Sequence, residues 1–173
     1  MVYQIDDYVV FGSYGVCQVK VIGHLDIGGT DKERIYYTLE PQYSKGSLVY
    51  SPIDNARVPM RSILTRAEAM ELISDISDLD TMPENALFTE QGLKEMLRTQ
   101  DSREWVRIIK SLYEKKKERL DAGKKNTSVQ ERFLKEAENN LYGELAFSLQ
   151  MPREKIQDYV IEAVKNGGIT INN

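Results

Sequence analysis

Two hydrophobic patterns divide this chain. Up to about residue 62, short runs of aromatic and β-branched residues are separated by glycine turns, which is typical of β-strands. After Thr65, apolar residues recur at intervals of three and four, which is typical of amphipathic helices. We therefore expect an α+β protein with a β domain at residues 1–62 and a helical domain at residues 63–173.

Four short strands are expected in the β domain, at residues 8–11, 16–22, 34–39 and 47–50. In the second strand, strict alternation would place Cys17, Val19 and Val21 on one face. Glycines mark the turns, and Pro52 ends the fourth strand. Strands this short predict a small barrel or a strongly bent sheet.

A bundle of about five helices is expected in the helical domain. The predicted N-terminal caps are Thr65, Thr89, Asp101 or Ser102, and Thr127 or Ser128, with Pro152 in the first turn of the last helix. Gly123 is expected to end the longest helix. The apolar stripe of that helix comprises Trp105, Ile108, Ile109, Leu112 and Leu120. Trp105 is therefore predicted to lie in the core rather than to stack on a base.

Composition favours a folded protein without a metal centre. Hydrophobic residues make up 41% of the chain, and Cys17 and His24 are the single cysteine and the single histidine. The first residues do not resemble a signal peptide, and no run approaches the roughly 18 apolar residues of a membrane span. We expect a cytoplasmic protein with no metal, no cofactor and no contact with a membrane.

Positive charge is concentrated in one part of an acidic chain. The net charge is −4, yet residues 98–135 contain twelve Lys or Arg and six Asp or Glu. Four cations recur at helical spacing, two more follow, and a row of cations can neutralise phosphates. The predicted cationic DNA contacts are Arg103, Arg107, Lys110, Lys117, Lys124 and Lys125. The alternative is an ordinary solvated helix face.

Catalytic elements are scarce in the sequence. There is no glycine-rich phosphate loop, and only His24 could serve as an imidazole base. We expect a protein that is not an enzyme and has no small-molecule substrate, although a dispersed carboxylate site stays open as an alternative. The apolar run Leu48–Val49–Tyr50 is either an edge that pairs with a partner strand or an inner strand.

Several segments resemble the CarD/CdnL family of bacterial transcription regulators. The start, residues 1–11, is similar to the family's hydrophobic-x-x-G-D-x-V-V-Y pattern, with Asp6 in place of Gly and Phe11 in place of Tyr. Residues 51–56 resemble its V-P-x-x-N-A segment, and residues 141–146 resemble a V-G-E-L-A segment. The resemblance covers about residues 1–150, with the same order of β and helical parts.

This resemblance implies a Tudor-like N-terminal domain that binds the β subunit of RNA polymerase. It also implies a helical domain that contacts promoter DNA at the upstream edge of the bubble and modulates open-complex stability. The implied polymerase-binding residues are Leu25, Leu48, Val49 and Tyr50, of which Leu25 and Tyr50 replace arginines of relatives. Leu87 and Phe88 lie where some relatives carry a tryptophan wedge for DNA. The alternative is an adaptor that docks on a protein without DNA contact.

Overall fold

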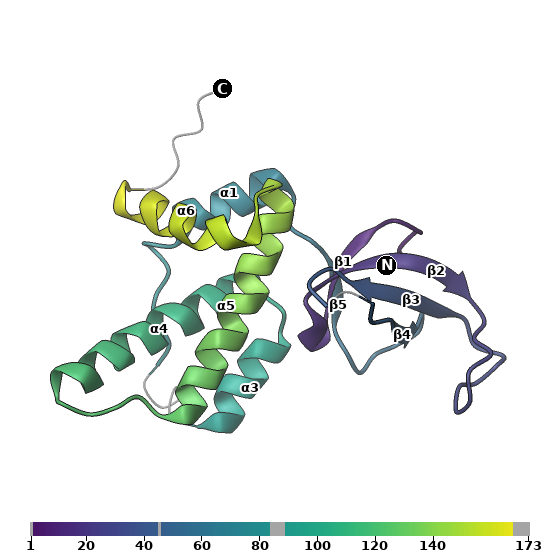
Figure 1. The fold of residues 1–173 in the computed structure, drawn as a ribbon, viewed down its shortest axis with the longest axis horizontal. Coiled ribbons are helices and arrows are strands. Elements are labelled where there is room, and N and C mark those ends of the chain that lie inside the picture. The colour runs from purple at the N-terminus through teal and green to yellow at the C-terminus, as the bar shows by residue number, and fades with distance from the viewer. Residues whose placement is uncertain (1, 45, 84–88, 168–173) are drawn as a thin grey trace. The chain divides into compact units, whose positions relative to one another are not determined.

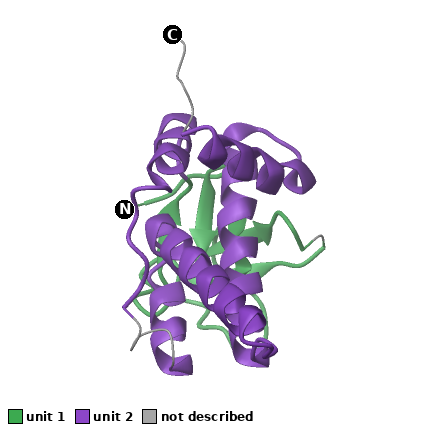
Figure 2. Cartoon of the chain, turned by 90° about the vertical axis from the view of Figure 1, so that its left-hand side faces the viewer, with its two compact units in different colours: residues 1–63 green, residues 64–173 purple. Residues whose placement is uncertain are grey.

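The computed structural model describes residues 2–44, 46–83 and 89–167 of the chain. The chain divides into two compact units, Met1–Ile63 and Leu64–Asn173 (Figure 2). The first contains a five-stranded antiparallel sheet and the second contains five helices in its described part (Figure 1). The α+β fold expected from the two hydrophobic patterns is confirmed.

The strands of the sheet lie in the order β4-β3-β2-β1-β5. Their bounds are β1 Tyr8–Phe11, β2 Val16–Gly23, β3 Tyr36–Pro41, β4 Val49–Pro52 and β5 Met60–Ser62. All four predicted strands are present, although β3 and β4 begin two residues later than predicted. The sequence did not predict β5, because three residues carry too little periodicity to be recognised.

A tight 3-10 turn, Gly12–Tyr14, joins β1 to β2. Gly12 and Gly15 have φ angles of 49° and 69°, in the left-handed region that favours glycine. A Cβ at Gly12 would also lie 2.9 Å from a methyl of Val58. The turn therefore needs glycine at its first residue, as the spacing of the glycines indicated.

One face of the sheet forms the core of the first unit. Its buried side chains are Tyr3, Val9, Phe11, Cys17, Val19, Tyr37 and Leu39. The register of β2 against β3 shifts between Val19 and Val21, which is a β-bulge. Because of this bulge Val21 does not share the face of Val19, so the grouping of Val21 with Cys17 and Val19 was wrong.

Four of the five described helices begin at polar capping residues. The bounds of the five are α1 Arg66–Asp75, α3 Glu90–Arg98, α4 Ser102–Asp121, α5 Ser128–Leu149 and α6 Arg153–Lys165. Thr65 and Glu68 form a reciprocal capping box, and Thr89, Asp101 and Thr127 cap the next three helices through their side chains. Within the described ranges, no helix combines the length and hydropathy that a membrane span requires.

Two predictions about helix positions were wrong. Pro152 occupies the N-cap of α6 rather than its first turn. Leu120 is 59% exposed, because the C-terminal part of α4 extends beyond the helices that cover its apolar stripe.

Gly123 ends α4 with a φ of 69°, and the amide of Lys124 donates to the carbonyl of Arg119 at 2.8 Å. This is the glycine C-cap that was predicted.

The core of the second unit is built around α4 and α5. Trp105 on α4 is completely buried, and so are Ile108 and Leu112 on the same helix and Leu145 on α5, which packs against α4. The prediction that Trp105 is a core residue is confirmed. Glu144 is also completely buried: one carboxylate oxygen accepts from the Leu64 amide at 2.9 Å and the other from the Ser102 hydroxyl at 2.8 Å.

Candidate functional site

β4 is an edge strand of the sheet, since only β3 pairs with it in the described part of the chain. The Ile53 amide donates to the Ile35 carbonyl at 3.0 Å, just beyond the strand. Hydrogen-bonded pairs recur at every second residue of an antiparallel ladder, so Tyr37 pairs in this way with Ser51. Tyr50 is the neighbour of Ser51 on β4 and lies opposite Thr38 in a pair that is not hydrogen-bonded, so its N–H and C=O point away from β3.

A free strand edge of this kind can accept a strand from a partner. Pro52 has no N–H to offer, so it limits the length over which such pairing can run. Beyond the strand, Arg34 forms an ion pair with Asp54, and its hydrogen bond lowers the pKa of the Asp54 carboxyl. This contact ties the end of β4 to the segment that precedes β3.

The predicted polymerase-binding residues differ in their exposure. Leu48 and Tyr50 are exposed by 51% and 38%, which is unusual for large apolar side chains. Val49 instead packs against the core of the sheet, because successive side chains of a strand point to opposite faces. Leu25 is half-buried in the connection between β2 and β3, outside both strands.

Val21 extends the apolar surface from β4 across the sheet. It pairs in register with Thr38, which in turn pairs with Tyr50, so the three side chains share one face. Val21 is 53% exposed. The sequence pattern missed Val21 because strict alternation placed it in the core, and a single bulged residue has no signal of its own.

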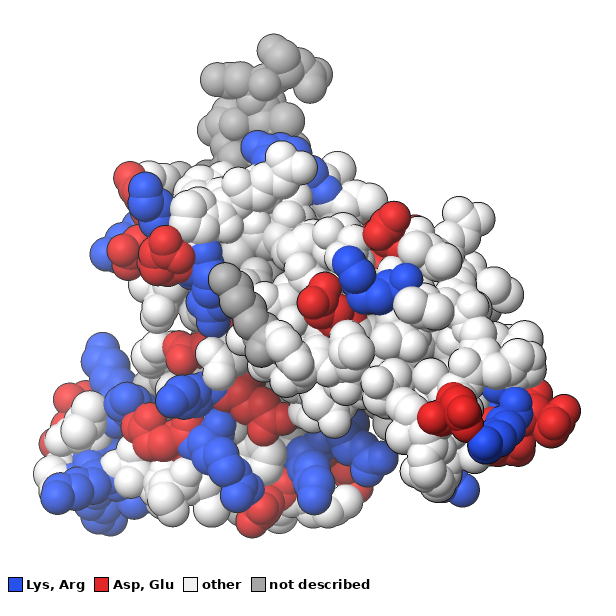
Figure 3. Space-filling model, turned by 45° about the vertical axis from the view of Figure 1, so that its right-hand side comes forward, with Lys and Arg blue, Asp and Glu red and all other residues white. Residues whose placement is uncertain are grey.

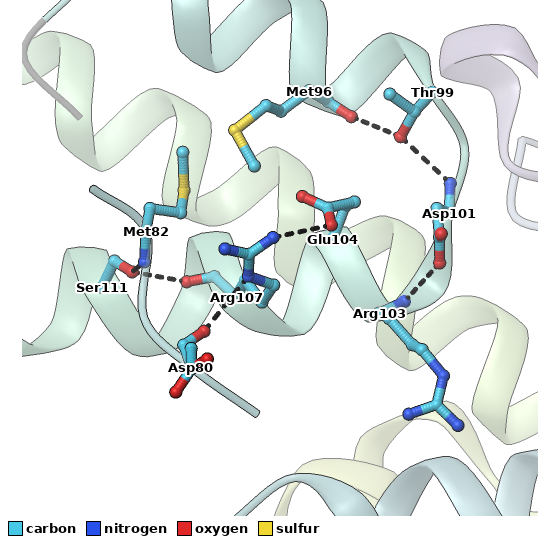
Figure 4. A network of polar contacts seen from close by, with 9 residues as sticks. All are labelled: Asp80, Met82, Met96, Thr99, Asp101, Arg103, Glu104, Arg107 and Ser111. Atoms are coloured by element: carbon cyan, nitrogen blue, oxygen red, sulfur yellow. Dashed lines mark hydrogen bonds and ion pairs between the residues drawn. The ribbon is translucent and has the colours of Figure 1, made fainter. Parts of the chain in front are cut away.

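Three of the predicted DNA-binding cations contact neighbouring protein groups. Arg103 forms an ion pair with Asp75 at 2.8 Å. Arg107 pairs with Glu104 at 2.9 Å and donates to the carbonyl of Asp80 at 3.2 Å, as Figure 4 shows. These guanidinium groups fasten α4 to the end of α1 and to the segment that follows it.

Lys110 has the most extensive of these contacts. Its ammonium group donates to the carbonyl oxygens of Ile76, Ser77 and Leu79 at 2.9, 3.3 and 2.6 Å. The last turn of α1 contains no basic residue of its own. Lys110 therefore supplies the positive charge that a helix C-terminus favours.

The exposed cations lie farther along the chain. Lys117 is exposed on α4, and Lys124 and Lys125 are exposed in the connection to α5. On the face shown in Figure 3, Lys and Arg are interspersed with Asp and Glu. Leu87 and Phe88 lie outside the described residues. In the part of the chain that the structure describes, no group of three or more His, Cys, Asp or Glu is placed to hold a metal ion.

Comparison with known families identifies the sheet-containing unit. Residues 3–64 match the model of the CarD-like/TRCF RID domain. The first unit of this chain is a CarD-like domain. The CarD-like domain supports an interaction with RNA polymerase. No curated protein is significantly similar to the chain in sequence. The match ends where the helical unit begins, so the resemblance of residues 141–146 stays a prediction.

Proposed function

We propose that this protein is a non-enzymatic transcription regulator. Its CarD-like domain docks on the β subunit of RNA polymerase, and its helical unit contacts promoter DNA near the upstream edge of the bubble. The observation that carries this proposal is the match of residues 3–64 to the CarD-like/TRCF RID domain. Docking on polymerase together with the contact to DNA would change the stability of the open promoter complex.

The docking part of the proposal uses the free edge of β4. A strand of the β subunit would pair with the outward N–H and C=O of Tyr50. The main-chain hydrogen bonds of this pairing would supply affinity. Leu48, Tyr50 and Val21 would add apolar contact on one side of this edge. The first test is a pull-down with purified RNA polymerase, which should retain the whole chain and not a chain without residues 1–63.

The DNA part of the proposal rests on cations that can reach a phosphate. Lys117, Lys124 and Lys125 are exposed and need no rearrangement to do so. Arg103, Arg107 and Lys110 would first have to leave their contacts at the end of α1. We therefore assign the weak, sequence-tolerant contact mainly to the C-terminal end of α4 and the connection after it.

A double variant tests this assignment on complexes of polymerase with promoter DNA. The protein is expected to change the lifetime of open complexes. Lys124→Glu with Lys125→Glu should make this change smaller and should flatten the dependence of the change on salt. Lys94→Glu with Lys155→Glu reverses the same number of exposed charges on α3 and α6 and serves as the control. Equal behaviour of the two double variants would remove the cations after α4 from the DNA contact.

A protein-only adaptor is the second candidate function. The observation in its favour is that Arg103, Arg107 and Lys110 already have protein partners, while charges of both signs are mixed on the visible surface. An adaptor would bind polymerase in the same way as the proposed regulator. It would leave the lifetime and salt dependence of open complexes unaffected by every charge reversal in the helical unit.

A further inference from the structure

The helical unit has an open apolar hollow between four of its segments. It has a volume of about 440 Å³ and lies between α4, α5, α6 and the end of α1. Its inner wall includes the buried side chains of Ile109, Leu141 and Val160. At its rim, Tyr113 and Ile161 are exposed by 43% and 41%. Exposed apolar groups around a concave apolar surface are typical of a binding site.

A second, polar hollow adjoins the first one. Its volume is about 650 Å³, and it shares Tyr113, Tyr142 and Gln157 with the apolar hollow. Tyr142 is 6% exposed and forms part of the wall common to both, and burial raises its pKa to about 12. The two hollows therefore lie next to each other, and together they are called the groove, with an apolar half and a polar half.

The groove is positively charged although the chain is acidic. Its lining contains six cations and two carboxylates, whereas the whole chain has a net charge of −4. The six cations are Lys110, Lys116, Arg132, Lys135, Arg153 and Lys165. Two of them have partners outside the lining or on the backbone: Arg132 pairs with Glu90, and Lys110 donates to the carbonyls at the end of α1.

Both carboxylates of the lining already have partners. Glu131 pairs with Lys116 at 3.0 Å, and Glu138 accepts from the Tyr113 hydroxyl at 2.7 Å. Arg153 lies over the Tyr142 ring, 5.5 Å from its centroid, and Lys135 is exposed. The polar half therefore presents cations next to the apolar half.

We propose that this groove binds an acidic amphipathic helix of a partner protein. Apolar side chains at helical spacing would fill the hollow beside Ile161, and carboxylates on the flank of that helix would face Lys135 and Arg153. The charge complementarity between the groove and an acidic partner selects this occupant. The proposal does not depend on the contact with polymerase or with DNA.

Other occupants fit the groove less well. A DNA backbone needs cations along its whole length. The apolar half offers only Lys165 and Lys110, and the Lys110 ammonium group already donates to three carbonyls. Both hollows are open to solvent, so an acyl chain would keep much of its surface in water. A helix needs only one face covered, which an open groove provides.

The test measures binding of a labelled peptide to the whole protein by fluorescence anisotropy. The probe is an alanine-based peptide of about four turns with leucines on one face and glutamates on its flank. We expect saturable binding that weakens as salt rises. Ile161→Glu and Lys135→Glu should each weaken it about tenfold or more, which is typical of the loss of a central contact.

Matched controls separate the groove from general effects of charge and hydrophobicity. Leu120→Glu alters another exposed apolar residue, which lies outside the lining, and Lys94→Glu reverses a cation on α3. Both should bind the peptide as wild type does, and circular dichroism should show four folded variants.

Several results would overturn the proposal. They are the absence of saturable binding, equal binding of a peptide in which lysines replace the glutamates, wild-type affinity of both groove variants, and displacement of the peptide by duplex DNA. Self-association that Ile161→Glu abolishes would instead identify a second copy of the chain as the occupant and would also reject the proposed partner.

Discussion

The indole of Trp105 is fully buried, and its N–H lies 3.5 Å from the carbonyl of Leu97. Trp105→Ala would leave a cavity in the core of the helical unit. We expect it to lower the free energy of unfolding by roughly 3–5 kcal/mol, measured by chemical denaturation. In the wild-type protein, tryptophan emission should be blue-shifted and poorly quenched by iodide. A loss below about 1 kcal/mol would be incompatible with this packing.

Glu144 joins two segments of the helical unit that lie far apart in sequence. Glu144→Ala would remove the acceptor of both the Leu64 amide and the Ser102 hydroxyl. Removing the acceptor of a buried donor costs about 1–3 kcal/mol. The Ser102 hydroxyl is buried and the Leu64 amide is part-buried, so we expect a clear loss of stability in denaturant titrations. Glu144→Gln keeps one amide oxygen and should lose less. Equal losses for the two variants would contradict this order, because Glu144→Gln keeps the volume of the side chain and leaves no cavity.

Cys17 lies in the core of the sheet, and burial raises its pKa to about 12 from an ordinary value of 9.0. At pH 8 this reduces the thiolate fraction on the order of a thousandfold, and burial also blocks access. A thiol reagent should therefore label the native protein very slowly and the denatured protein rapidly. Since the chain has one cysteine, the signal reports Cys17 alone. Fast labelling of the native protein would contradict the buried position.

The sequence predicts some residue roles and not others. Trp105 could be assigned to the core because Ile108, Ile109 and Leu112 share its helix face. Val21 could not be placed, because the bulge that turns it outward depends on pairing with β3. The contacts of Arg107 likewise depend on where α4 meets the segment after α1, and helical spacing carries no information on this.

At the scale of elements, the end of α1 depends on a cation from another helix. Lys110→Met keeps the apolar stem of the side chain and removes its three hydrogen bonds to the carbonyls after α1. Because the group is only half-buried, we expect a loss of about 1–2 kcal/mol in the free energy of unfolding. Lys117→Met, on the exposed part of α4, should change it by less than about 0.5 kcal/mol. Similar values for both variants would mean that Lys110 is only solvated.

Capping residues explain why the helices could be predicted well. Thr65, Thr89 and Thr127 act through local hydrogen bonds, so their positions in the sequence mark where three helices begin. β5 and the exact start of β4 could not be found in this way. These short strands exist because they pair with β1 and β3, and pairing partners are set by the whole sheet.

At the scale of the whole molecule, the fold class follows from a change of hydrophobic period, and the binding surfaces do not. The position of β4 at the edge of the sheet excludes the inner strand as an interpretation of Leu48–Val49–Tyr50, and pairing with a partner strand stays a prediction. The groove of the helical unit was not visible in the sequence, because α1, α4, α5 and α6 each supply only part of its lining. Such surfaces arise from tertiary packing.

The central claim is that the edge of β4 in the CarD-like domain binds RNA polymerase. The most direct measurement is the affinity of the whole chain for purified polymerase, compared between wild type, Tyr50→Asp and Tyr14→Asp. Tyr14 is a matched control, since it is 51% exposed and lies in the turn between β1 and β2. We expect Tyr50→Asp to weaken binding about tenfold or more and Tyr14→Asp to bind nearly as wild type does. Wild-type affinity of a folded Tyr50→Asp protein would contradict the account.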